Sequence, residues 1–310
     1  MDLVAGVLSG DPRSIARAIS MVEDGAEGLE ELSKGLFPHT GRAWTIGLTG
    51  SPGVGKSTLA AQLVHEARRR DQTVAVLAID PTSPFTGGAL LGDRVRMQAH
   101  ATDPAVFIRS MATRGHLGGM ALAAPEAVRI LDAAGRDRIL VETVGVGQAE
   151  VDVAAATDTT LVVVAPGWGD QVQVAKAGIL EIADVFVVNK SDREGVEAAM
   201  RDLRQMIHMG AETPWTPPIV KTSSTEADGI GELWDAIEEH RTYLETSGEL
   251  DQTRRARLLR EVETLTAERL RAGARELLTS DVALANDLAE RRVDPYRAAA
   301  ILAERVPSER

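Results

Sequence analysis

Short apolar runs alternate with longer amphipathic segments through the middle of the chain, from residue 41 to residue 247. Several of these runs are unbroken series of Val, Ile and Leu, the pattern of parallel strands that are buried on both faces. We expect strands at residues 45–49, 73–79, 105–111, 138–143, 159–165, 185–189 and 218–223. Helix-like segments lie between or after them, at 55–70, 120–134, 174–182, 194–207 and 229–247. This alternation predicts an α/β fold, a doubly wound and mostly parallel sheet whose ligands bind at the carboxyl ends of the strands.

The two ends of the chain follow a helical period instead. Residues 1–40 have apolar positions at helical spacing, with Asp11-Pro12 as a helix start. Beyond a boundary at Ser247-Gly248, one helix face carries Leu258, Val262, Leu265, Leu270, Ala274 and Leu277. So short a tail can hardly fold alone, so it must pack on the central domain, on a second subunit or on a partner. We therefore expect an N-terminal helical extension (1–40), a central α/β domain (41–247) and a C-terminal helical arm (248–310).

Composition narrows the classes of protein to which this sequence can belong. With 44% hydrophobic and 26% charged residues it has the balance of a soluble globular protein, and 3% aromatic residues imply an aliphatic core. The absence of cysteine excludes disulfides, thiol nucleophiles and cysteine-bound metal. A net charge of −12 argues against nucleic acid as a partner. No apolar run could span a membrane and no basic signal region begins the chain, so we expect a cytoplasmic location and no membrane partner.

The strongest motif joins the first predicted strand to the helix after it. Residues 50–57, GSPGVGKS, match the phosphate-binding P-loop pattern G-x-x-x-x-G-K-[ST]. Its glycines let backbone N–H groups approach phosphate oxygens, and the following helix adds the positive end of its dipole. Lys56 would place its charge at the β- and γ-phosphates, and the Ser57 hydroxyl would bind Mg²⁺. The sequence thus predicts a nucleoside triphosphate site made by Gly50, Ser51, Pro52, Gly53, Val54, Gly55, Lys56, Ser57 and Thr58.

Three acidic residues are candidates for the acidic groups around Mg²⁺ in this site. Asp80 closes the second predicted strand, and Asp93 lies in a polar turn that leads into a helix. Either one could approach Mg²⁺ directly or through water, or could simply cap a helix or belong to a solvated turn. Glu142 ends an apolar strand, where a carboxylate is costly unless it faces a cation or strong donors. It takes the Walker-B position, with Glu in place of the commoner Asp, and is a candidate catalytic residue together with Lys56.

Two further loops after strand ends carry residues that could respond to the nucleotide. Gly145 can present its N–H to the γ-phosphate. Gln148 either orients the attacking water or is an ordinary polar residue at a helix start. The segment 166–176 is either a contact surface that responds to the nucleotide or a simple strand-to-helix turn. Its candidate switch residues are Asp170, Gln173 and Lys176.

The motif Asn189-Lys190-Ser191-Asp192 follows a buried strand and bears on the choice of base. Asp192 can accept hydrogen bonds from N1–H and N2–H₂ of guanine together, whereas adenine would leave this carboxylate against a lone pair. Asn189 can bridge the base and the P-loop, and the stem of Lys190 can cover the base face. The next strand ends in Thr222-Ser223-Ser224, which suits backbone contact with the guanine O6. In this order behind a P-loop, the two motifs predict that the nucleotide is GTP.

Seven stretches of the chain together resemble the MeaB/ArgK/MMAA family of P-loop GTPases: GSPGVGKST, AIDPTSPFTGG, GDRVRM, FIRSMATRGHLGG, VETVGVGQ, PGWGDQVQVAKAG and VVNKSD. The similarity extends over about residues 40 to 245. It implies a GTPase chaperone that gates cofactor loading and protects an adenosylcobalamin-dependent acyl-CoA mutase, typically methylmalonyl-CoA mutase. Members are usually homodimers joined through a C-terminal helical arm. The ligands implied are GTP or GDP and Mg²⁺, and the partners implied are such a mutase and a second copy of the chain.

The resemblance also implies roles for the residues found above. Lys56 and Ser57 would bind phosphate and Mg²⁺, and Asp80, Asp93 and Glu142 would form the acidic surroundings of the metal ion. Asn189, Lys190 and Asp192 would recognise guanine. The segment 166–176 would be a switch that reports the nucleotide state to the mutase. Some relatives carry an older label as arginine/ornithine-transport ATPases or kinases, and nucleotide competition would test that alternative. A metallocentre-maturation GTPase of the nickel-insertion type is another, although the sequence lacks cysteine and clustered histidine. An interaction module without chemistry is disfavoured by the intact phosphate and metal residues.

Overall fold

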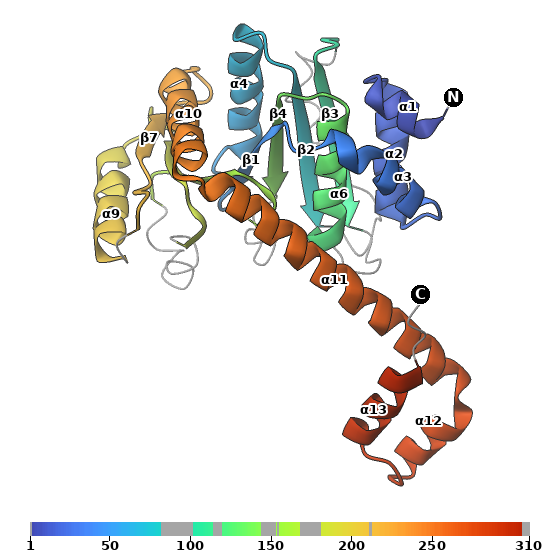
Figure 1. Ribbon diagram of the computed structural model, residues 1–310. Coiled ribbons are helices and arrows are strands. Elements are labelled where there is room, and N and C mark those ends of the chain that lie inside the picture. The colour runs from blue at the N-terminus through green and yellow to red at the C-terminus, as the bar shows by residue number, and fades with distance from the viewer. Residues whose placement is uncertain are drawn as a thin grey trace.

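The structure, a computed structural model, describes residues 2–81, 102–113, 120–143, 153, 155–167, 181–210 and 213–305. Its centre is a sheet of seven strands in the order β3-β2-β4-β1-β5-β6-β7, with every neighbouring pair parallel (Figure 1). The strands are β1 (Trp44–Thr49), β2 (Val74–Pro81), β3 (Val106–Thr113), β4 (Arg138–Thr143), β5 (Thr159–Val164), β6 (Val185–Asn189) and β7 (Ile219–Thr222). Each predicted strand is therefore confirmed, as is the doubly wound α/β class.

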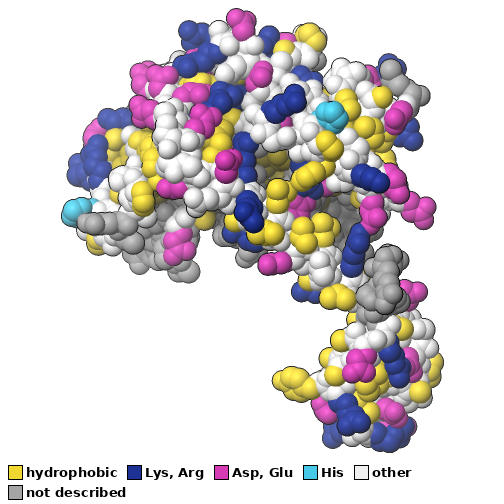
Figure 2. Space-filling view, viewed as in Figure 1, with side chains coloured by type: hydrophobic (Ala, Val, Ile, Leu, Met, Phe, Trp, Pro, Cys, Tyr) yellow, Lys and Arg dark blue, Asp and Glu magenta, His cyan; other side chains and the backbone are white. Residues whose placement is uncertain are grey.

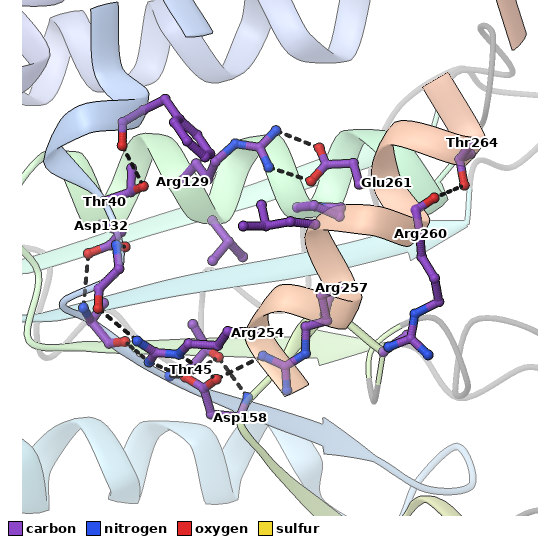
Figure 3. Close-up of a pocket in the computed structure, with 18 residues that line it drawn as sticks. Thr40, Thr45, Arg129, Asp132, Asp158, Arg254, Arg257, Arg260, Glu261 and Thr264 are labelled. Atoms are coloured by element: carbon purple, nitrogen blue, oxygen red, sulfur yellow. Dashed lines mark hydrogen bonds and ion pairs between the residues drawn. The ribbon is translucent and has the colours of Figure 1, made fainter. Parts of the chain in front are cut away.

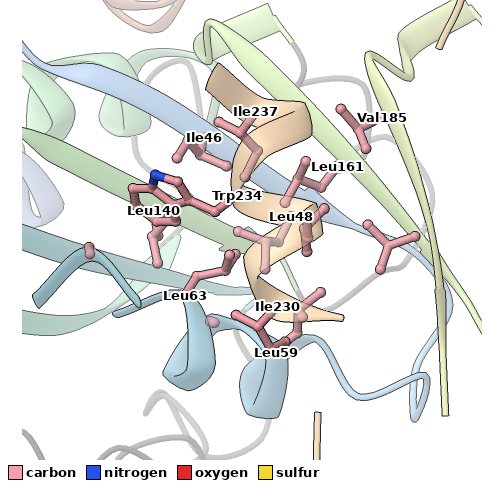
Figure 4. Packing of buried hydrophobic residues seen from close by; sticks show 14 of the residues in the cluster. Ile46, Leu48, Leu59, Leu63, Leu140, Leu161, Val185, Ile230, Trp234 and Ile237 are labelled. Carbon is pink, nitrogen blue, oxygen red and sulfur yellow. The ribbon is translucent and has the colours of Figure 1, made fainter. Parts of the chain in front are cut away.

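Four of the strands, β1, β4, β5 and β6, are buried over their whole length because helices cover both faces of the sheet. On one face Leu48, Leu63 and Trp234 join an apolar cluster shared by the sheet, α4 and α10 (Figure 4). On the other face α6 and α9 complete two further clusters. These helices are α4 (Lys56–Arg69), α6 (Met120–Ala133), α9 (Val196–Met209) and α10 (Ile230–Ser247). They confirm four predicted helices; most of the fifth, at 174–182, lies outside the described residues.

The N-terminal helices pack on the sheet domain. They are α1 (Leu3–Leu8), α2 (Pro12–Asp24), α3 (Leu29–Leu36) and the short 3₁₀ helix η1 (Phe37–His39). The predicted start of α2 is correct: an Asp11 carboxylate oxygen accepts a hydrogen bond from the Ser14 backbone N–H at 2.8 Å, with Pro12 as the first helical residue. Ile15 and Ile19 are fully buried in the cluster that α6 shares with the sheet. The extension therefore enlarges the hydrophobic core rather than standing apart from it.

The C-terminal residues form a long helix that leaves the body and ends in two short helices (Figure 1). These are α11 (Glu249–Ser280), α12 (Val282–Ala289) and α13 (Pro295–Arg305). The short helices pack against the end of α11 through a small cluster around Leu284 and Leu302. All of α11 is described and none of its side chains is buried. Hydrophobic and charged side chains mingle along this arm on the face seen in Figure 2.

The base of α11 is fixed to the sheet by charge. Asp158, which is 4% exposed and precedes β5, accepts hydrogen bonds from the backbone N–H and the hydroxyl of Thr45 at 3.1 and 2.9 Å. Arg254 and Arg257 of α11 reach the same carboxylate, each with a nitrogen-to-oxygen distance of 2.8 Å (Figure 3). One buried carboxylate thus joins the starts of β1 and β5 to the arm.

A second ion pair holds the next turns of α11. Both outer nitrogens of Arg129 on α6 lie 2.5 Å from the carboxylate of Glu261. Between this pair and the Asp158 contacts lies a cavity of about 500 Å³, partly walled by Phe37, Val128 and Leu258 (Figure 3). The first turns of the arm are therefore held to the body by two ion-pair contacts with an apolar cavity between them.

Candidate functional site

The glycine-rich loop between β1 and α4 has a backbone that only glycine suits at two positions. Gly50 has a φ of 137°, and a Cβ there would lie 2.1 Å from the carbonyl oxygen of Val163. Gly55 has a φ of 102°, and its Cβ would lie 2.5 Å from the side-chain nitrogen of Asn189. These contacts leave no room for a side chain, so the loop keeps a bare backbone cradle of the kind that phosphate oxygens approach.

Lys56 and Ser57 begin α4 and are almost completely buried. The Lys56 ammonium folds back over the loop and donates to the carbonyl oxygens of Gly50 and Ser51 at 2.6 and 3.2 Å. The Ser57 hydroxyl donates to Glu142 at 2.6 Å. A cation, a hydroxyl and a carboxylate therefore lie together at the carboxyl end of the sheet.

Glu142 reaches that position because β4 lies beside β1. Leu48 is in register with Glu142, so the last residues of the two strands end level with one another. The Glu142 side chain is 5% exposed, and a hydroxyl next to a carboxylate is a pair of hard oxygen donors of the kind that Mg²⁺ prefers. Asp80 lies near the end of β2, the other neighbour of β4, so its backbone reaches the same edge.

Several predicted residues cannot be placed. The side chain of Asp80 lies outside the described part of the chain. So do all atoms of Asp93, Gly145, Gln148, Asp170, Gln173 and Lys176. Within the described residues, no group of three or more His, Asp or Glu side chains could hold a metal ion.

The second loop of the site follows β6 and is tied to the first. The Asn189 side-chain N–H₂ donates to the carbonyl oxygen of Val54 in the P-loop at 2.8 Å. Its oxygen accepts from Thr222, and from the backbone N–H and the hydroxyl of Ser224, at 3.1, 3.2 and 2.8 Å. Asn189 is 2% exposed, so this network is sealed from water. The amide therefore locks three loops into one arrangement.

Lys190 and Asp192 stand on the open side of this network. Lys190 has a φ of 60°, a left-handed conformation that is rare without glycine, and its ammonium donates to the Gly53 carbonyl oxygen at 2.6 Å. Asp192 is exposed, and one of its oxygens accepts from the Ser223 hydroxyl at 3.0 Å. The carboxylate is thus held beside the Ser223-Ser224 turn, with its charge open to a ligand.

One residue of this network, Gln62 of α4, was not among the sequence candidates. Its side chain donates to the carbonyl oxygen of Ser224 at 3.0 Å. Gln62 carried no signal in the sequence, since a lone glutamine on a helix looks like an ordinary solvated residue.

A glycine-rich phosphate loop and an Asn-Lys-Ser-Asp loop therefore meet at one edge of a parallel sheet. That pairing, on this fold, defines the class of P-loop GTPases.

Comparisons with known proteins narrow the class further. The family model described as Methylmalonyl Co-A mutase-associated GTPase MeaB matches residues 15–277. A Pyrococcus abyssi protein named as a GTPase is 47% identical over 98% of this chain and 96% of its own length. GTPase ArgK of Escherichia coli is 38% identical over 79% of this chain and 77% of its own. A crystal structure described as a LAO/AO transport system kinase has a TM-score of 0.72 at 27% identity and covers 98% of this chain and 96% of its own.

The chain belongs to the MeaB family and is a GTPase. Membership confirms the predicted resemblance and the binding of guanine nucleotide. The relatives described above carry different names, and these names do not give the chain a partner.

Proposed function

We propose that this GTPase is a chaperone that gates cofactor loading and protects an adenosylcobalamin-dependent acyl-CoA mutase of the methylmalonyl-CoA mutase type. The description of the matching family model, which names that mutase, supports the proposal. The observation that carries it is the layout of the nucleotide edge. The chain leaves the sheet after Thr143 and after Val164, on the two strands that flank β1 and its P-loop. A partner that contacts the chain just after these two strands could distinguish GTP from GDP. It would do so if its contacts differ between the two nucleotide states, since a ligand shifts an equilibrium only through such differences.

In this proposal the phosphates of GTP lie along the P-loop, with Lys56 at the β- and γ-phosphates. Ser57 and Glu142 would hold Mg²⁺, and their hydroxyl and carboxylate, 2.6 Å apart, fit that ion. The bound ion would neutralise charge on the phosphates. Asp80 and Asp93 would belong to the acidic surroundings of the metal ion. Gly145 would contact the γ-phosphate, and Gln148 would orient the attacking water.

The base would lie against the loops after β6 and β7. Asp192 would accept from N1–H and N2–H₂ of guanine, while Asn189 fixes the loop and the Lys190 stem covers the ring. Ser223 and Ser224 would bound the O6 side. The observed tie between Ser223 and Asp192 supports this arrangement, because it holds the carboxylate next to the turn.

The same proposal includes a homodimer whose interface is formed by the arm (248–310). The domain at 41–247 would be the catalytic unit, and residues 1–40 would be its helical extension. Leu259 and Val262 on α11 are 57% and 59% exposed, and a partner surface would remove them from water. Val262→Glu should therefore convert the dimer to a monomer in sedimentation velocity. Arg275→Glu, at an exposed position that the helical period places on the opposite side of the same helix, should leave it intact. A dimer that survives Val262→Glu would place the joint elsewhere.

The experiment that tests the function is GTP hydrolysis with and without an adenosylcobalamin-dependent methylmalonyl-CoA mutase. Turnover by the chain alone should be slow, because none of the proposed site residues is an arginine. The mutase should raise it, and Asp170→Ala or Lys176→Ala should remove most of that rise while GDP affinity stays nearly unchanged. Lys34→Ala on α3 is the matched control and should behave as wild type. Absence of stimulation in the wild type would contradict the chaperone proposal.

The two alternative functions have simple tests. An arginine/ornithine-transport type ATPase or kinase, suggested by the description of the similar crystal structure, should bind ATP at least as well as GTP. A metallocentre-maturation GTPase should bind nickel in a direct titration. Preference for GDP over ADP together with no nickel binding would leave the mutase chaperone as the better account.

A further inference from the structure

The turn after β7 is fixed at both of its ends. Ser223 and Asp228 exchange backbone hydrogen bonds of 3.0 and 3.2 Å, which close residues 223–228 into a small loop. Gly229 then begins the path into α10 with a φ of 72°, and a Cβ there would lie 2.0 Å from the Lys221 carbonyl oxygen. The turn is thus pinned tightly against the end of β7.

Gln62 adds a third anchor from a different part of the chain. Its side-chain nitrogen donates to the Ser224 carbonyl oxygen at 3.0 Å. Gln62 is half-buried on α4, the helix that begins with Lys56. One rigid helix therefore bears the phosphate-loop lysine at its start and holds the base-side turn farther along.

The contact between Gln62 and the Ser224 carbonyl also fixes the direction of the next backbone N–H, that of Thr225. No described peptide bond is cis, and in a trans peptide the carbonyl and the N–H point in opposite directions. When the Ser224 carbonyl points to Gln62, the N–H of Thr225 in the same peptide must point away from α4. The Ser224 N–H and hydroxyl are already used, since both donate to Asn189. Among the hydrogen bonds of the described residues, the Thr225 N–H has no acceptor.

Guanine has an acceptor at the matching place. Its O6 is next to N1–H, and N1–H is the group that Asp192 would bind. Because Ser223 ties Asp192 to this turn, the edge of the base that faces Asp192 also faces the turn. A backbone N–H at this place can only donate a hydrogen bond, so it favours a base with an acceptor oxygen at position 6.

We propose that Gln62 is a positioning residue for base selection: by holding the Ser224 carbonyl, it aims the Thr225 N–H at the exocyclic oxygen of guanine. This inference rests on the proposed base site. It divides the reading of the base in two, with Asp192 reading the N1 and N2 groups and the Gln62-held peptide reading O6.

The test uses two nucleotides that each change one half of the base edge. 6-Thio-GDP has sulfur, a weaker acceptor, in place of O6, and IDP lacks only the 2-amino group. Affinities of the full chain for GDP, 6-thio-GDP and IDP are measured for wild type, for Gln62→Met, which keeps the shape but has no donor, and for Gln62→Glu, which places an acceptor against the carbonyl. Loss of one hydrogen bond predicts that the preference for GDP over 6-thio-GDP falls from about tenfold to about threefold or less in both variants. Their preference for GDP over IDP should stay at the wild-type value.

Two controls separate positioning from general damage. Arg69→Ala, at an exposed position of the same helix, should change neither ratio, and thermal unfolding of each variant reports its stability. Asp192→Asn should show the opposite pattern and change the ratio of GDP to IDP. If wild type does not prefer GDP over ADP, the proposed base site itself is wrong. If it does, but the Gln62 variants keep the ratio of GDP to 6-thio-GDP or lose all three ligands equally, the inference about Gln62 is overturned.

Discussion

The sheet domain and the arm are held in place by different forces. In the sheet domain Leu63 and Trp234 are at most 1% exposed, in a cluster that joins the sheet to α4 and α10. In α11 no side chain is buried, and the helix is attached through Asp158 and Glu261. Apolar burial is non-directional and gains from dense packing, whereas an ion pair depends on the direction from which each group approaches.

The difference shows how each part suits its proposed use. Dense packing fixes the carboxyl ends of the strands, where a nucleotide site needs its groups held to within a fraction of an ångström. Attachment by charge leaves the apolar positions of α11 uncovered, among them Leu259 and Val262, so that another surface can bury them. One part of the chain builds a site and the other presents a surface.

If leucines of the core and of the arm contributed equally to stability, the two parts would not be held by different forces. Leu63→Ala removes a fully buried side chain between α4 and the sheet, so the free energy of unfolding should fall by roughly 3–4 kcal/mol. Leu259→Ala, at an exposed position on α11, should lower it by less than about 0.5 kcal/mol. Equilibrium unfolding in urea at low protein concentration measures both. A loss at Leu259 as large as the loss at Leu63 would show that the arm is buried in the folded chain.

His240 should make the free energy of unfolding of the sheet domain depend on pH. Burial lowers the pKa of His240 to about 4, an effect that the charge of Asp158 only partly offsets. Between the ordinary pKa of about 6.5 and this value, the unfolded chain binds a proton that the folded chain does not. His240 should therefore contribute a fall in the free energy of unfolding of roughly 2–3 kcal/mol as the pH drops through this window. Asp184, whose carboxylate lies 3.4 Å from the His240 ring, acts in the opposite direction, because burial raises its pKa to about 7. His240→Gln should remove that part of the pH dependence, and identical pH profiles for wild type and variant would contradict it.

The ion-pair contact of the arm can be removed by one substitution. Asp158→Asn keeps the shape but removes the buried counter-charge of Arg254 and Arg257. Because both arginines are partly exposed to water, this loss should cost about 2 kcal/mol. Hydrogen exchange should rise over 249–264 and stay unchanged in α4. Glu268→Gln, which breaks an ion pair within α11, is the control and should leave exchange at the base of the arm unchanged. Faster exchange throughout the sheet domain instead would mean that Asp158 stabilises the fold as a whole.

The pKa of Asp158 places this contact in a different pH range. Burial by itself would raise the pKa of its carboxyl, but Arg254 and Arg257 outweigh burial and hold it below the ordinary value. A lowered carboxyl pKa stabilises the folded state above the unfolded-state pKa of about 3.9, and this stabilisation is lost only as the pH falls through the lowered value. The arm should therefore stay attached across the window in which His240 is expected to take up its proton.

The sequence predicted the sheet domain well because its signals are local. Runs of Val, Ile and Leu are sufficient to identify buried parallel strands, and the P-loop and the Asn-Lys-Ser-Asp motif are contiguous in sequence. The Asn189 bridge to the P-loop was also foreseen, because the motif implies its own geometry. These features depend on neighbours in the chain rather than on distant contacts.

The arm contacts and Gln62 could not be predicted for the opposite reason. Asp158 precedes a strand, where an aspartate usually caps or turns, and Arg254 and Arg257 are two of many arginines in the tail. Their pairing joins residues about a hundred positions apart, and no periodicity encodes it. Gln62 likewise acts on a turn far along the chain. Long-range polar contacts follow from the fold and cannot be read before it is known.

The smallest expected effect concerns a third ion pair between the arm and the body, one that is exposed to water. Arg269 on α11 forms an ion pair with Glu30 on α3, and their side chains are 67% and 74% exposed. Water screens such a pair and both long side chains lose freedom in forming it, so Arg269→Ala should change the free energy of unfolding by less than about 0.5 kcal/mol. Hydrogen exchange at the base of the arm should also be unaffected, in contrast to Asp158→Asn. If Arg269→Ala raised hydrogen exchange at the base of the arm as much as Asp158→Asn does, attachment would depend on the number of ion pairs and not on the burial of the Asp158 carboxylate. The outcome we expect instead is that a single buried carboxylate sets the position of the helix.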